Sequence, residues 1–430
     1  MKALSVLCLT QALASLALGF SDQEPILDAV EEEARQKWDF FWGYSGISTF
    51  GHLPHKRCLV EPYERFDIGV IGVPFDTAVS YRPGKRGGNT PSFLSVEILV
   101  RVLRLIRSST VGARFGPRAI RAASNRHLPS RGFSTYSGLN PYMSWAKVLD
   151  CGDVPVNPFD NDLALRQMTE ALEELSAKRQ TTSDREDLKV PKLLILGGDH
   201  SIALPALRAM NKAYGQPVAV VHFDAHLDTL HPSSYPSVWS SKQTEFTHGS
   251  MFWQAGNEGL VLNDSSIHAG LRTRITGDDW ADYIRDDEQG FLRLTTEDID
   301  DIGPQGIVDR IIERVGTERP VYLSIDIDVL DPSIAPGTGA PEPGGWTMRE
   351  MNRIIRGMDK LNIVGADIVE VSPAFDDHTE NTAFAAAQLG YEIILNWVKK
   401  GLDKAPLTEQ EAKILSAEQK EEGTKIHTEL

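Results

Sequence analysis

Six short apolar runs recur between residues 66 and 370, and each has the length of a single β-strand. Their residues are mostly aliphatic or β-branched, with little of the polar alternation expected of a strand that has one solvated face. The runs are Ile68–Val73, Leu193–Leu196, Val218–Phe223, Ile267–Leu271, Val321–Ile327 and Ile363–Val369. The pattern therefore predicts strands that are buried on both faces.

Segments with apolar residues at helical spacing lie among these runs. They are Leu163–Lys178, Ile202–Tyr214, Thr347–Leu361 and Asn381–Lys400. Buried strands separated by helices indicate a mainly parallel sheet that is covered by helices on both faces. A hydrophobic content of 41% is enough to fill the core of such a fold, and it excludes a largely disordered chain. We predict an α/β fold.

Three polar strings stand at or near the carboxyl ends of predicted strands, which is where ligands gather in open parallel sheets. The first is Gly-Gly-Asp-His-Ser at residues 197–201, and the second is Asp-Ala-His-Leu-Asp at residues 224–228. The third is Asp-Ile-Asp-Val-Leu-Asp-Pro at residues 326–332. Because side chains alternate along an extended backbone, Asp224, His226 and Asp228 would all point the same way.

Two imidazoles and four carboxylates in these strings form a ligand set suited to two divalent ions of the Mn²⁺ kind. They belong to His200, Asp224, His226, Asp228, Asp326 and Asp328. Clustered carboxylates repel one another strongly unless cations balance their charge. A paired-metal site forms a hydroxide nucleophile at neutral pH, so this set predicts a hydrolase. Asp199 and Asp331 are interpreted as supporting or turn residues, and His222 as a core histidine.

Two further residues have two interpretations each. His248 follows a loop rich in Ser and Pro that begins after Asp228, and it is either a proton shuttle beside the metals or a surface histidine. Glu370 ends an apolar run, and it either pairs with a planar cation such as a guanidinium group or caps a helix. The residues alone leave both choices open.

At these motifs the chain resembles the ureohydrolase (arginase/agmatinase) superfamily, over about residues 66–84 and 113–400. The combination GGDHS, DAHxD and SxDxDxxDP is highly specific. The resemblance implies a three-layer α/β/α fold with a mainly parallel sheet of about eight strands. It also implies two Mn²⁺ ions per chain, one held by His200, Asp224, Asp228 and Asp326, and the other by His226, Asp224, Asp326 and Asp328.

The resemblance also assigns roles outside the ligand set. It implies that Glu370 anchors a guanidinium group and that His248 shuttles a proton, with Asp228 part of the catalytic machinery. Members of the superfamily form trimers and hexamers, so a homo-oligomer is expected. None of the motif positions is substituted, which favours an active enzyme over a catalytically silent metal-binding member.

The expected substrate is a small cationic guanidino compound. A His-Gly-Ser-Met-Phe run at residues 248–252 and a Pro-Glu-Pro-Gly-Gly loop at 341–345 resemble agmatinases, which favours cleavage of agmatine to putrescine and urea. The alternative is 4-guanidinobutyrate, whose carboxylate would need a cation such as Arg272 or Arg274 near the pocket mouth. A net charge of −16 argues against nucleic acid as a partner and suits a cationic substrate, although solubility alone also explains it.

The N-terminal and C-terminal segments predict the cellular localisation of the protein. Residues 1–19 have the apolar run and small-residue ending of a cleaved signal peptide, which would leave no stable membrane span. Residues 20–65 are expected to be a lead-in, 66–403 the catalytic domain, and 404–430 a polar tail. The last four residues, His-Thr-Glu-Leu, resemble an H-D-E-L retention signal, so the protein is expected in the ER lumen or secreted.

Residues 85–112 interrupt the family pattern, in which an Arg-Pro-Gly run continues directly into Ala-Arg-Phe-Gly-Pro. The favoured interpretation is a retained intron translated in frame, because Gly84-Lys85 can be encoded with a splice donor. The alternatives are a genuine surface insertion and an amphipathic membrane-surface helix, since the segment ends in a basic, apolar run.

Two cysteines, Cys58 and Cys151, remain once the expected signal peptide is removed. They would form a disulfide in an oxidising lumen. However, Cys151 follows the strand-like run Val148–Asp150, so a buried free thiol is an equal alternative.

Overall fold

The computed structural model describes residues 47–79, 112–183, 185, 188–232 and 245–404. The described residues from Ser48 onward belong to one compact unit, and the description below concerns that unit. The predicted signal peptide lies outside the described residues, as do the predicted polar tail except Lys404 and the 85–112 insertion except Gly112.

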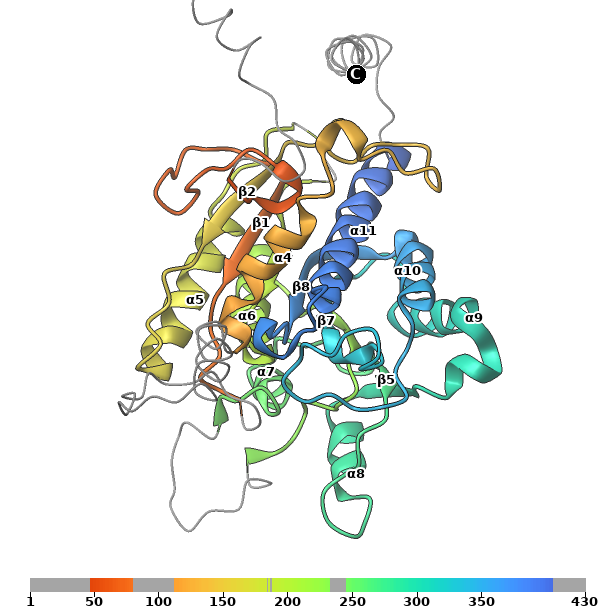
Figure 1. Cartoon of the computed structure of the whole chain (residues 1–430). Coiled ribbons are helices and arrows are strands. Elements are labelled where there is room, and N and C mark those ends of the chain that lie inside the picture. The colour runs from red at the N-terminus through yellow and green to blue at the C-terminus, as the bar shows by residue number, and fades with distance from the viewer. Residues whose placement is uncertain (1–46, 80–111, 184, 186–187, 233–244, 405–430) are drawn as a thin grey trace, which may run out of the picture. The chain divides into compact units, whose positions relative to one another are not determined.

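A single eight-stranded sheet forms the middle of the molecule, with the strand order β2-β1-β3-β8-β7-β4-β5-β6 (Figure 1). All neighbouring strands run parallel. The strands are β1 (Ile68–Val73), β2 (Val148–Asp153), β3 (Lys192–Gly197), β4 (Ala219–Phe223), β5 (Ser266–Leu271), β6 (Phe291–Thr295), β7 (Pro320–Asp326) and β8 (Asn362–Val369). The predicted α/β fold with a mainly parallel, eight-stranded sheet is confirmed.

Six of these strands correspond to the predicted apolar runs, and the two at the sheet edges do not. Only the first half of the edge strand β2, Val148–Asp150, has a strand-like apolar pattern, because its second half is Cys-Gly-Asp. The other edge strand, β6, buries only Phe291 and Leu294, and its other three residues are half-buried. Edge strands therefore lack the continuous apolar pattern that revealed the inner six.

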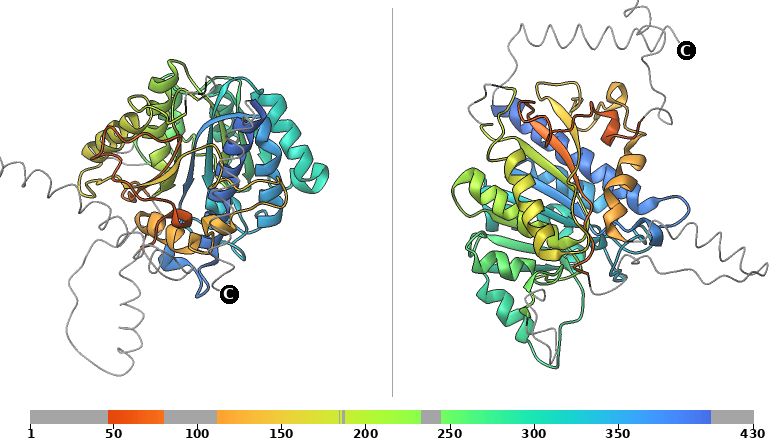
Figure 2. Two further views of the ribbon diagram at one scale, coloured as in Figure 1. Left: turned by 90° about the horizontal axis from the view of Figure 1, so that it is seen from above. Right: turned by 90° about the vertical axis from the view of Figure 1, so that its left-hand side faces the viewer.

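Helices cover both faces of the sheet, as Figure 2 shows. The described helices are α4 (Gly116–Ser124), α5 (Asn161–Leu175), α6 (Ala203–Tyr214), α7 (Met251–Asn257), α8 (Ala281–Glu288), α9 (Asp298–Val315), α10 (Met348–Gly357) and α11 (Asn381–Lys404). Alternate residues of β3 enter two separate cores, with Leu193 and Ile195 packing beside α5, α6 and α7, and Leu194 and Leu196 beside α4, α9, α10 and α11. This is the three-layer arrangement expected. Among the described helices, none combines the length and apolar character needed to cross a bilayer.

The predicted helices begin and end where local sequence signals stand. The Asp160 side chain accepts a hydrogen bond from the backbone N–H of Leu163 and caps α5, while Thr347 and Glu350 form a reciprocal capping box at α10. Gly215 ends α6 with a φ of 67°, a conformation that glycine adopts without strain. The helix α9 escaped prediction because Gly303 and Pro304 break its periodicity.

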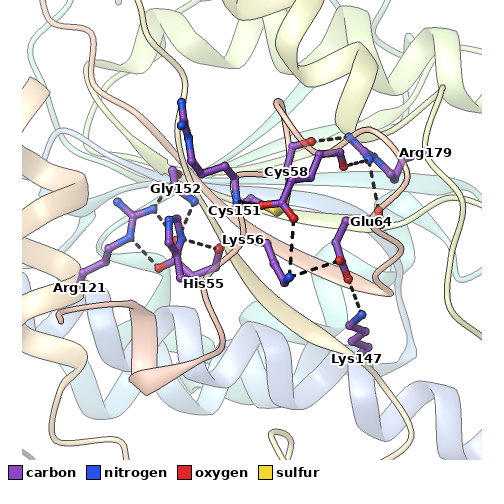
Figure 3. Close-up of a disulfide and its surroundings, with 12 residues drawn as sticks. His55, Lys56, Cys58, Glu64, Arg121, Lys147, Cys151, Gly152 and Arg179 are labelled. Carbon is purple, nitrogen blue, oxygen red and sulfur yellow. Dashed lines mark hydrogen bonds and ion pairs between the residues drawn. A yellow bond between two sulfur atoms is a disulfide. The ribbon is translucent and has the colours of Figure 1, made fainter. Parts of the chain in front are cut away.

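A disulfide joins Cys58, in the segment before β1, to Cys151 in β2 (Figure 3). Both cysteines are buried, and Arg179 donates a hydrogen bond to the carbonyl oxygen of Cys58 at 2.7 Å. Of the two possibilities that the sequence left open, the free thiol is therefore wrong. Phe50 and Leu53 belong to the same core as Leu194 and Leu196. The described part of the lead-in therefore packs against the catalytic domain.

Candidate metal centre and pocket

The predicted metal ligands stand at the carboxyl ends of adjacent central strands. His200 lies in the short 3₁₀ turn after β3, Asp224 follows β4, and Asp326 is the last residue of β7. Between β3 and β7 lies β8, which is followed by Glu370. Neighbouring parallel strands end at the same edge of a sheet, and this topology brings the separate motifs together.

The first cluster surrounds the fully buried ring of His200. Its Nδ1 atom lies 3.1 Å from Asp224 Oδ2, 3.1 Å from Asp228 Oδ2 and 3.4 Å from Asp326 Oδ2. Despite this proximity, Nδ1 makes no hydrogen bond of acceptable geometry. A buried nitrogen without such a bond, surrounded by three carboxylate oxygens, is the arrangement that a divalent cation completes.

The second cluster surrounds His226. Its Nδ1 atom lies 3.0 Å from Asp224 Oδ1 and 3.0 Å from Asp328 Oδ2. The two oxygens of Asp224 thus face different histidines, so this carboxylate stands between the two clusters. The ligand atoms of Asp224, His226 and Asp328 all lie within 4.8 Å of one another, which is close enough for one metal ion.

The electrostatics of the clusters also fit metal ions. Burial and the neighbouring charges of Asp328 and Asp224 raise the pKa of Asp326 well above its usual range. Burial, followed by the charge of Asp224, raises the pKa of Asp228 to about 6. Mutual repulsion disfavours the ionisation of all these carboxylates unless positive charge is added, and divalent cations supply that charge.

His222 is also within ligand distance of the first cluster, but both of its ring nitrogens already have partners. Its Nε2 atom lies 2.9 Å from Asp224 Oδ2, and its Nδ1 atom lies 2.7 Å from His268 Nδ1. Burial is the main cause that lowers the pKa of His222 to about 3, so the ring is neutral. The residue interpreted as a core histidine is buried, but it also supports a predicted ligand.

Further hydrogen bonds orient the predicted ligands. Ser324 Oγ lies 2.8 Å from His200 Nε2 and donates to Asp367 Oδ1 at 2.8 Å, which fixes the His200 ring. Asp199 accepts from the backbone N–H groups of Ala78 and Ser201, and it is not part of either cluster. Asp331 accepts from backbone N–H groups in the following loop and lies in a turn.

A pocket of about 220 Å³ opens onto the clusters. His226, Asp228, Asp326, Asp328, His248 and Glu370 all line it. His248 Nδ1 lies 3.8 Å from Glu370 Oε1, and burial lowers the pKa of His248 to about 4, helped by the charges of His226 and His200. His248 is therefore a pocket residue that retains 19% side-chain exposure, and the surface-histidine interpretation does not describe it.

Glu370 makes a capping contact and also lines the pocket. Its Oε1 atom accepts the backbone N–H of His200 at 2.9 Å, at the start of the 3₁₀ turn, which is a capping interaction. Its Oε2 atom accepts no hydrogen bond from the described residues, and the carboxylate lines the pocket. One oxygen thus fixes the side chain and leaves the other for a ligand.

The two arginines suggested for the pocket mouth differ. Arg272 donates to the backbone carbonyl oxygens of Asp328 at 2.5 Å and Glu342 at 2.7 Å, so its guanidinium group is a structural clamp between two loops. Arg274 is exposed and lines the pocket. Of the pair, only Arg274 is placed to meet a ligand.

Part of the pocket wall was not anticipated from the sequence. Asp282 and Tyr283, in α8, line the pocket together with Ile275 and Thr276. The helix α8 has eight residues and two buried side chains, both aspartates, so it lacks the apolar stripe by which helices are recognised. No sequence signal marked these residues.

Comparison with known proteins identifies the class. A model of the arginase family matches residues 103–396, and the chain belongs to this family, which makes it a hydrolase of the ureohydrolase superfamily. It is similar to a Schizosaccharomyces pombe protein named "Putative agmatinase 1", with 42% identity over 85% of this chain and 86% of the other. It is also similar to an agmatinase from Enterobacter, with 36% identity over 79% of this chain and 91% of the other.

A solved structure gives the same relationship in three dimensions. The proclavaminate amidinohydrolase of Streptomyces clavuligerus is 33% identical, with a TM-score of 0.65, and the match covers 84% of this chain and all of the other. The predicted membership of the superfamily and the predicted hydrolase class are thereby confirmed.

Proposed function

We propose that this protein is a binuclear manganese hydrolase that cleaves agmatine to putrescine and urea. The observation that carries the proposal is the pair of His/Asp clusters sharing Asp224, beside a pocket that also holds Glu370 and His248. Agmatinase relatives that are similar over most of this chain support the choice of substrate.

Two Mn²⁺ ions would be held by the residues of the two clusters. His200, Asp224, Asp228 and Asp326 would hold one, and His226, Asp224, Asp326 and Asp328 the other. When bound, the ions supply a water-derived nucleophile at neutral pH and electrostatic stabilisation of the charge that develops during attack.

The side chains of the pocket would position the substrate. The Oε2 atom of Glu370 pairs with the planar guanidinium group, while the bond from His200 N to Oε1 keeps the carboxylate turned toward the pocket. His248 lines the same pocket as Glu370, so its ring would lie beside the bound guanidinium group. The neutral imidazole accepts a proton there and passes it to the leaving amine. Leu227, Leu230 and Ile275 offer apolar contact to a methylene chain.

A second substrate, 4-guanidinobutyrate, is favoured by one observation. Arg274 lines the pocket and is exposed, so it would pair with a distal carboxylate and repel the distal amine of agmatine.

Comparing kcat/KM for the two substrates in the wild type and in Arg274→Gln separates the possibilities. If agmatine is the substrate, the wild type has the higher kcat/KM for agmatine, and in Arg274→Gln the preference for agmatine is unchanged or larger. A wild-type preference for 4-guanidinobutyrate that falls at least about tenfold in Arg274→Gln would replace agmatine as our assignment.

We further propose that the chain enters the secretory pathway and is secreted or kept in the ER lumen. The apolar N-terminal run supports a cleaved signal peptide, and the Cys58–Cys151 disulfide suits an oxidising compartment. Expression in eukaryotic cells followed by N-terminal sequencing tests this. A mature chain that starts at Phe20 supports the proposal, and an intracellular chain that still carries Met1 refutes it. Removing the last four residues should move a retained protein into the medium.

A further inference from the structure

One buried carboxylate outside the pocket connects to both metal clusters. Asp286, in α8, has no exposed surface. Its Oδ1 atom accepts a hydrogen bond from Thr229 Oγ1 at 2.7 Å and lies 3.0 Å from His268 Nε2, and its Oδ2 atom accepts from Arg293 Nη1 at 2.7 Å. Two of these three partners connect Asp286 to predicted metal ligands, Thr229 as the chain neighbour of Asp228 and His268 through His222.

The first route runs through Thr229, which is the residue after Asp228. Asp228 has a φ of 54°, in the left-handed region that is unfavourable for a residue with a Cβ atom, so its conformation must be held by its surroundings. The Thr229 hydroxyl is fixed by Asp286, and the Thr229 carbonyl oxygen accepts from Gln289 Nε2 at 3.0 Å. Both contacts come from α8 or the residue that caps it, so this helix fixes the backbone that presents Asp228.

The second route runs through two histidines. His268 Nδ1 lies 2.7 Å from His222 Nδ1, and His222 Nε2 lies 2.9 Å from Asp224 Oδ2. His268 is also stacked on Phe291, with ring centroids 4.1 Å apart, which fixes the plane of its ring. The rings of His268 and His222 therefore both have contacts at their two nitrogens. The second ring contacts Asp224, the carboxylate between the two clusters.

We infer that Asp286 is a positioning residue of the metal centre. It orients Asp228 through Thr229 and Asp224 through His268 and His222, although it is neither a predicted ligand nor a pocket residue. This inference rests on the proposed function, because it concerns the affinity of the site for Mn²⁺. Partners of this kind hold a ligand in its binding geometry, and their loss weakens metal binding.

The direct test is the dissociation constant for Mn²⁺, measured by calorimetry on the full chain, in wild type and in Asp286→Asn. We expect the substitution to weaken binding by about 10- to 100-fold. Asp287→Asn is the matched control, because Asp287 lies next in the chain, is 61% exposed and pairs with the same Arg293 at 2.8 Å. The control should bind Mn²⁺ like the wild type. An Asp286→Asn protein that loses thermal stability without metal but keeps wild-type affinity overturns the inference.

Thr229 offers a second test that leaves Asp286 in place. Thr229→Val removes the hydroxyl that Asp286 holds, whereas Thr229→Ser keeps it, so only the valine variant should bind Mn²⁺ more weakly. This pair decides the question if Asp286→Asn fails to fold, and equal affinities in both variants and the wild type would contradict the inference. If the wild type binds no Mn²⁺ at all, the proposed metal centre itself fails, and the two failures are thereby distinguished.

Discussion

At the scale of single residues, Asp224 links the two clusters because its two oxygens face the rings of His200 and His226. The residues around it were recognisable from sequence because two of the three strings alternate ligands along short stretches of backbone, and the third places His200 directly after a predicted strand. Asp286 and Arg272 were not recognisable in their roles, because their contacts join segments that are distant in sequence. Such contacts depend on packing, and no spacing pattern records them.

Loss of one carboxylate from the first cluster should abolish the reaction. In Asp228→Ala or Asp326→Ala the ligand set loses an oxygen donor and a negative charge, so we expect no Mn²⁺-dependent urea release. Asp331→Ala is the control, because Asp331 lies in a turn outside both clusters and the variant should keep its activity. The measurement is urea formed with increasing Mn²⁺. Wild-type urea release in either cluster variant would refute the ligand assignment.

Removal of the proposed proton shuttle should affect the rate rather than substrate binding. His248→Asn preserves the size and polarity of the side chain but cannot transfer a proton, so kcat should fall about 10²- to 10⁴-fold while KM changes little. Steady-state kinetics at saturating Mn²⁺ measure both constants. If kcat is unchanged, or if KM alone rises, His248 binds the substrate and does not shuttle the proton.

At the scale of elements, the central strands place the site and the flanking elements hold it. The inner six strands were predictable because both of their faces are buried, whereas β2 and β6 at the edges carry polar residues. The short helix α8 was not predictable, although it supplies part of the pocket wall and anchors the loop after Asp228. Its sequence has few apolar residues, and its position is set by buried polar contacts.

The disulfide should stabilise the attachment of the segment before β1 to the edge strand β2. Cys58 and Cys151 are separated by 93 residues, so the cross-link restricts a long stretch of the unfolded chain. We expect Cys58→Ser/Cys151→Ser to lower the free energy of unfolding by about 2 to 4 kcal/mol, measured by chemical denaturation. Wild type treated with a reductant is the control and should approach the double variant. Equal stability of oxidised wild type and double variant would show that the bond contributes nothing.

At the scale of the whole molecule, we predict that the segment at 85–112 is an insertion that the enzyme does not require, although the match to the arginase family model begins within it, at residue 103. The residues on either side of it already meet, because Arg114 forms an ion pair with Asp76 and its backbone N–H lies 3.2 Å from Asp76 Oδ2. Deleting 85–112 should therefore leave a folded protein that keeps its Mn²⁺-dependent urea release. Circular dichroism and the urea assay on the two chains check this. An active full chain and an inactive deletion variant would mean that the segment is a genuine part of the enzyme.

One measurement joins the two metal ions to the product of the reaction. The chain is stripped of metal with a chelator, and urea release from agmatine, 4-guanidinobutyrate and arginine is followed as Mn²⁺ is restored. We predict that urea appears only with Mn²⁺, that the activity saturates at about two ions per chain, and that agmatine is the preferred substrate. Two bound ions with no urea from any of the three compounds would contradict the proposed function and identify a catalytically silent member of the family.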